Sequence, residues 1–113
     1  MPLSGPELRR SQRILATVPL TVTGESASGM FIEETNSLVV NAHGALITLS
    51  EKVSQGQHLN LKNNKTMEEV ECRVVFSVPA EQGGHRVGVE FTRSVADFWH
   101  IPAPPQDWLA HTY

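Results

Sequence analysis

The sequence has little that would indicate catalysis, secretion or membrane insertion. It holds a single cysteine among 113 residues, so no internal disulfide can form, which is typical of a reducing cytoplasm. Its net charge of −3 at pH 7 argues against a general binder of nucleic acid polymers. No apolar run approaches the ~20 residues that a membrane helix requires. Nothing near Met1 resembles a signal peptide. We therefore expect a cytoplasmic protein with no membrane segment.

The residue types that carry chemistry are scattered along the chain. None of the 5 histidines stands at ligand spacing from another histidine or from Cys72, which predicts no metal site. The carboxylate pairs Glu33-Glu34 and Glu68-Glu69 consist of sequence neighbours, which point to opposite faces of a strand. No serine stands at a nucleophile elbow, and no glycine-rich loop leads into a helix. We expect no catalytic site and no cofactor, and hence a protein that is not an enzyme.

Alternation of apolar and polar residues dominates the chain from residue 14 to residue 92. It is clearest over residues 14–23, where β-branched residues alternate with threonines, a pattern typical of a half-buried strand. Similar runs occupy residues 30–34, 38–40, 45–49, 58–62, 67–78 and 86–91. In the longest of them, the residues predicted to face the core are Val70, Cys72, Val74, Phe76 and Val78. Short strands joined by short turns favour a closed antiparallel barrel, because closure removes exposed edges.

The periodicity changes only near the end of the chain. Ser94 followed by Asp97 resembles a helix start, and Val95, Phe98 and Trp99 would then share one helical face. The prolines at positions 102, 104 and 105 would end that helix. We predict one domain over residues 1–113, composed of a basic arm (1–13), a β-barrel (14–92), and a short C-terminal helix with a proline and aromatic tail (93–113).

The aromatic residues of this last segment have two possible roles. Trp99, Trp108 and Tyr113 could pack across the barrel as a lid, or they could form an exposed docking patch. Packing is the commoner fate of such side chains.

Three arginines, Arg9, Arg10 and Arg13, gather directly before the first strand. Guanidinium groups bind phosphate oxygens and the O6/N7 edge of guanine through paired hydrogen bonds. A focused cluster on a mildly acidic domain suits a small anionic ligand, although the arginines could also be solvated residues that keep the N-terminus soluble. An oligonucleotide-binding barrel would need exposed strand aromatics. We expect Phe31, Phe76 and Phe91 to be buried instead, which argues against an oligonucleotide-binding barrel.

Several short motifs, taken in order, resemble the PilZ domain family. Arg9 and Arg13 form an RxxxR pattern before the first strand, and a hairpin follows at residues 41–46. A Cys72-Arg73-Val74-Val75 strand and the Gly88-Val89-Glu90-Phe91 signature complete the match, which spans residues 9–92. The resemblance implies a six-stranded antiparallel β-barrel that binds cyclic di-GMP, a bacterial second messenger, and acts as an adaptor rather than an enzyme.

The resemblance also implies a ligand site. In the family, the RxxxR arginines grip phosphate and guanine, and a DxSxxG motif on a hairpin contacts the other part of the ligand. By position, the ligand-binding candidates in this sequence are Arg9, Arg10, Arg13, Asn41 and Gly44.

The sequence departs from the second motif at two positions. Asn41 replaces the serine and can still form hydrogen bonds, whereas Val39 replaces the aspartate and cannot accept from a guanine N–H. Loss of such a bond costs about 1.5–3 kcal/mol, or roughly ten- to a hundred-fold in affinity. Glu33, Glu34 or Ser37 could supply an acceptor instead.

Two functions therefore stay open at this point. The first is a cyclic di-GMP receptor of weakened affinity, in which the ligand orders the arm and creates a surface for a protein partner. The second is a PilZ-fold protein–protein interaction module that no longer binds nucleotide.

Overall fold

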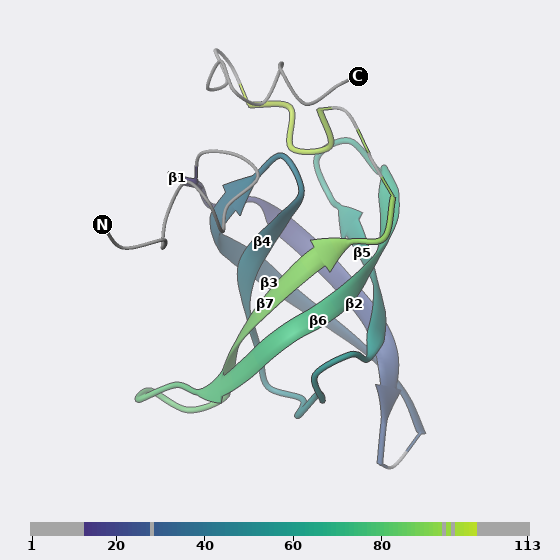
Figure 1. The fold of residues 1–113 in the computed structure, drawn as a ribbon, viewed down its shortest axis with the longest axis vertical. Helices are drawn as coiled ribbons and strands as arrows, with labels where there is room; N and C mark the ends of the chain where they lie inside the picture. The colour runs from purple at the N-terminus through teal and green to yellow at the C-terminus, as the bar shows by residue number, and fades with distance from the viewer. Residues whose placement is uncertain (1–12, 28, 94, 96, 102–113) are drawn as a thin grey trace, which may run out of the picture.

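The computed structural model describes residues 13–27, 29–93, 95 and 97–101. Its strands are β1 (Ile14–Leu15), β2 (Pro19–Ser26), β3 (Gly29–Asn41), β4 (Gly44–Leu49), β5 (His58–Asn63), β6 (Glu69–Pro79) and β7 (His85–Phe91). They form one antiparallel sheet in the order β1-β3-β2-β5-β6-β7-β4, and an additional β3–β4 pairing closes it into the barrel of Figure 1. The predicted six-stranded barrel is confirmed, and the short β1 is added at the end of β3.

The barrel interior is filled by the apolar members of the alternating runs. Leu20 and Val22 of β2, Leu59 and Leu61 of β5, and Cys72 of β6 are all buried. Burial raises the pKa of the Cys72 thiol to about 12, so this cysteine behaves as a small apolar core residue.

The segment predicted as two strands, at residues 30–34 and 38–40, is a single long strand. β3 pairs with β2 along its first half and with β4 along its second half, and its register shifts between Ser37 and Val39. The polar residues between the two predicted strands suggested a turn, but Ser37 is buried within β3. Its hydroxyl donates to the Ala16 carbonyl and accepts from the Val18 amide, at 2.6 and 2.9 Å. These bonds hold the segment that connects β1 to β2 against β3.

The predicted inward orientation of Phe76 and Val78 is wrong. Val70, Cys72 and Val74 are buried as expected, but the β6–β7 register shifts between Val74 and Phe76. One extra residue in a strand inverts the side-chain alternation that follows it. Phe76 and Val78 consequently lie on the outer face, with exposed fractions of 46% and 45%.

The predicted C-terminal helix is absent from residues 95 and 97–101, the described part of that segment. Asp97 and His100 have φ values of 59° and 53°, which are incompatible with a right-handed helix. Phe98 and Trp99 are instead buried across one end of the barrel, where both rings contact Phe91. The lid expected of Trp99 is confirmed, whereas Trp108 and Tyr113 lie outside the described residues.

Candidate functional site

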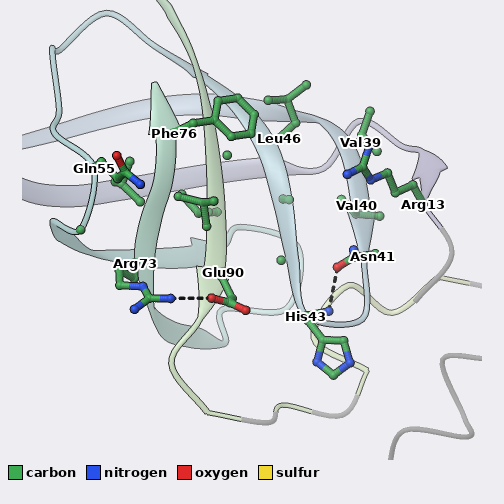
Figure 2. Close-up of a pocket in the computed structure, with 17 residues that line it drawn as sticks. Arg13, Val39, Val40, Asn41, His43, Leu46, Gln55, Arg73, Phe76 and Glu90 are labelled. Carbon is green, nitrogen blue, oxygen red and sulfur yellow. Dashed lines mark hydrogen bonds and ion pairs between the residues drawn. The ribbon is translucent and has the colours of Figure 1, made fainter. Parts of the chain in front are cut away.

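A pocket of about 570 Å³ lies on the outer face of the barrel, over β3, β4, β6 and β7. Arg13, directly before β1, borders it on one side, and Arg73 of β6 borders it on the opposite side (Figure 2). A volume of this size is in the range that small-molecule ligands occupy. The strand registers explain both its position and its chemistry.

Two rows of outward-facing residues cross these strands side by side. The polar row, in which each residue is the register partner of the next, consists of Arg73, Glu90, Gly44 and Asn41. The apolar row, related in the same way, consists of Phe76, Gly88, Leu46 and Val39. In Figure 2 the side chains of the apolar row lie along one side of the pocket, and those of the polar row lie along the other. A ligand in this pocket would therefore meet an apolar surface and a hydrogen-bonding surface at once.

Each row contains a glycine at an inner position, and neither glycine has room for a side chain. A Cβ at Gly44 would lie 2.1 Å from the Val89 carbonyl oxygen, so the close approach of β4 to β7 permits no side chain there. A Cβ at Gly88 would lie 2.4 Å from the Phe76 ring, which therefore covers the glycine. The pocket surface is therefore backbone at Gly44 and the Phe76 ring at Gly88.

The hairpin between β3 and β4 is held by hydrogen bonds from three directions. The Asn41 side-chain oxygen accepts from the His43 amide at 2.8 Å, an arrangement that asparagine commonly makes in tight turns. The Phe91 amide donates to the His43 carbonyl, and the Trp99 indole N–H donates to the Asn41 carbonyl, both at 2.8 Å. The buried aromatic residues at the barrel end thus fix the hairpin that borders the pocket.

An ion pair occupies the polar side of the pocket. Nη2 of Arg73 lies 2.8 Å from Oε1 of Glu90, and the two side chains are 53% and 28% exposed. A neighbouring hollow also borders on this pair and on His58. His58 also forms a hydrogen bond with Glu71, which lowers the pKa of the Glu71 carboxyl.

Of the predicted ligand-binding residues, the structure brings Arg13, Asn41 and Gly44 together in this one pocket. Arg9 and Arg10 lie outside the described residues. The side chains considered as substitutes for an aspartate at position 39 are engaged elsewhere or do not line the pocket. Glu33 accepts from the Ser50 and Glu51 amides. Ser37 is buried in β3 and bonds to Ala16 and Val18. Glu34 is not among the pocket residues.

Sequence reasoning missed Arg73, Glu90 and Phe76 as pocket residues. Arg73 and Glu90 are polar residues on strands in which polar and apolar residues alternate. Only the register of β6, β7 and β4 places them beside Gly44. The sequence offered two signals, their outward parity and their places in the two strand signatures, and neither by itself distinguishes a site from solvated surface.

A comparison with protein-family models matches the PilZ domain over residues 7–97. The chain belongs to the PilZ domain family. PilZ domains are typically non-catalytic receptor domains. A comparison with curated proteins gives no match.

Solved structures of PilZ proteins share the fold. The Bacillus subtilis inhibitor of motility (MotI/DgrA) matches with a TM-score of 0.60 and 18% identity, over 78% of this chain and 44% of that one. This chain thus spans less than half of that protein's length. The PilZ domain of CeSA from a cellulose-synthesizing bacterium matches with a TM-score of 0.54 and 25% identity, over 75% of this chain and 84% of that one. Within the described residues, no helix has the length and apolarity to cross a membrane.

Proposed function

We propose that this PilZ domain binds cyclic di-GMP in the outer-face pocket, with weakened affinity, and acts as an adaptor rather than as an enzyme. The observation that carries the proposal is the meeting of Arg13 with Asn41 and Gly44 in one pocket, although 27 intervening residues separate Arg13 from Asn41. Arg13 of the arginine motif thus borders the same pocket as Asn41 and Gly44 of the hairpin motif, and this supports the proposal.

The pocket has the chemistry that a cyclic dinucleotide requires. The ligand carries anionic phosphates, which arginine binds through charge-assisted hydrogen bonds, and flat purine bases, which pack against apolar surface. Arg13 offers the first, and the row from Phe76 to Val39 offers the second. Arg9 precedes Arg13 by 4 residues, so an extended chain, at up to ~3.5 Å per residue, lets it reach the same ligand.

The proposed mechanism is that the ligand orders the arm around residues 8–13 against the barrel. The ordered arm and the bound nucleotide would together form a surface that the free protein lacks, and a protein partner would recognise that surface.

Isothermal titration calorimetry with cyclic di-GMP tests the proposal. We expect saturable binding by the parent protein and at least ~100-fold weaker binding by the double variant Arg9→Ala/Arg13→Ala, because two charge-assisted contacts are lost. Arg86→Ala is the matched control, since Arg86 is an exposed arginine of β7 that does not line the pocket. A flat titration of the folded parent at high ligand concentration would overturn the proposal.

The second candidate function is a protein–protein interaction module that has lost nucleotide binding. Val39 favours it, because this residue adds to the apolar row and supplies no acceptor. A parent that binds no nucleotide, combined with a Val39→Asp/Asn41→Ser variant that does, would support this candidate.

A further inference from the structure

The segment of residues 97–101 lies across one end of the barrel and is bonded to the hairpin that borders the pocket. We propose that Trp99 of this segment is a positioning residue for the pocket, so that ligand binding and the seating of the segment stabilise each other. The inference rests on the proposed function and deepens it, because it identifies a part of the chain that regulates the pocket from outside it.

The segment is anchored on the β5 side of the barrel end. The buried Asn63 side chain of β5 donates to the Phe98 carbonyl at 3.0 Å. Nε2 of His100 lies 2.7 Å from Oε1 of Glu68, in the connection between β5 and β6. Neither Asn63 nor Glu68 lines the pocket. These two anchors therefore hold the segment whether or not the pocket is occupied.

Trp99 connects the anchored segment to the pocket. Its buried ring packs against Phe91 and Phe98, with ring centroids 5.8 and 5.0 Å away. Close packing leaves such a ring little freedom, so its indole N–H has a fixed position. That N–H donates to the Asn41 carbonyl at 2.8 Å. The position of Asn41 therefore depends on how the segment is seated.

The bond acts on the residue through which the hairpin would meet the ligand. Asn41 and Gly44 are register partners, and both line the pocket. The Asn41 side-chain oxygen accepts from the His43 amide, so the orientation of this side chain follows the hairpin backbone. A ligand binds more tightly to a hairpin that is already ordered, because the ordering cost is not incurred on binding. By linkage, the bound ligand stabilises the contact between Trp99 and the hairpin in return.

The backbone of the segment makes its shape dependent on such contacts. Asp97 and His100, which flank Phe98 and Trp99, have φ values of 59° and 53°. Non-glycine residues adopt this left-handed region at a cost in free energy, and they stay there where the surrounding contacts hold them. The bond to Asn41 is among those contacts. A change at the hairpin is therefore transmitted to the segment.

The first test separates affinity for the ligand from stability of the fold. Trp99→Phe keeps an aromatic ring against Phe91 and removes the indole N–H. By isothermal titration calorimetry well below the melting temperature, we expect the dissociation constant of cyclic di-GMP to rise roughly 3- to 10-fold, the value of one neutral hydrogen bond. Val22→Ala is the control, because Val22 is a core residue of β2 outside the pocket. It should lower the melting temperature and leave the dissociation constant within about twofold of the parent's.

The second test detects the reverse effect and keeps Trp99 intact, so it does not depend on the folding of Trp99→Phe. In a Trp108→Phe variant, Trp99 is the only tryptophan, and its indole N–H gives a single nuclear magnetic resonance signal. Trp99 does not line the pocket, so a shift of this signal reports a change passed through the hairpin. We expect a saturable shift on titration with cyclic di-GMP, with the dissociation constant found by calorimetry.

The outcomes separate this inference from the proposed function. The inference is overturned, and the proposed function stays intact, if the parent binds cyclic di-GMP and Trp99→Phe binds it equally well. The same holds if the Trp99 indole signal does not move at saturating ligand, or if Val22→Ala weakens binding as much as Trp99→Phe. A folded parent that binds no cyclic di-GMP overturns both.

Discussion

Replacement of Gly44 by alanine is expected to destabilise the domain by about 3 kcal/mol or more. The added Cβ would lie 2.1 Å from the Val89 carbonyl oxygen, and this obstacle is backbone of the adjacent strand β7. Neither group can move unless β4 and β7 separate, which would disrupt the hydrogen bonds between the two strands. In a domain of this size, the expected loss lowers the melting temperature by more than ~10 °C.

Gly88→Ala is the matched control for this prediction. It adds the same methyl group on the neighbouring row, but the atoms it meets belong to the half-exposed Phe76 ring, which can rotate away. We expect a loss of about 1 kcal/mol or less, measured by urea unfolding followed by circular dichroism. Equal losses for the two variants would show that the approach of β4 to β7 is not the reason for glycine at position 44.

Phe98→Ala is expected to cost about 3–5 kcal/mol, as is typical of a phenylalanine lost from a core. Phe98 is 1% exposed and packs edge-to-face against Phe91 and Trp99, with ring centroids 5.3 and 5.0 Å away. Its carbonyl also accepts from the buried Asn63 side chain at 3.0 Å. Removal of the Phe98 ring leaves a cavity at the end of the barrel. It also loosens the packing of Trp99, whose indole N–H donates to the Asn41 carbonyl of the hairpin.

Phe76→Ala provides the comparison within the same residue type. Because the shift in β6 places Phe76 on the outer face, we expect a loss of only about 1 kcal/mol in the same unfolding experiment. If the two variants were equally destabilised, the assignment of Phe76 to the pocket and of Phe98 to the core would be wrong.

The strands and the barrel could be predicted because alternation is a local property of the chain. The shift in β6 could not be predicted, because Val74, Val75 and Phe76 are three consecutive apolar residues. Either parity of this run could have faced the core. The continuity of β3 was hidden for a related reason. A buried serine in a strand looks like a turn residue until its partners, here Ala16 and Val18, are known.

The C-terminal segment shows how tertiary packing can override a local helix signal. The spacing of Ser94 and Asp97 favoured a helix. Burial of Phe98 and Trp99 against Phe91 contributes more stabilising free energy than one turn of helix could.

The candidate site was predictable only where its residues belong to a linear motif. Arg13, Asn41 and Gly44 could be named in advance because the motif fixes their spacing. Arg73 and Glu90 enter the pocket through strand pairing, which depends on the register of three strands and therefore on long-range structure.

The most direct test of the central claim is to map cyclic di-GMP binding by nuclear magnetic resonance, with the backbone amides of the glycines as reporters. Gly44 and Gly88 line the proposed pocket, whereas Gly24 belongs to β2, which lies opposite β7 in the strand order of the barrel. We predict saturable shifts of the Gly44 and Gly88 signals and an unchanged Gly24 signal. Shifts centred on Gly24, or no shift of any glycine signal at saturating ligand, would contradict binding at the outer-face pocket.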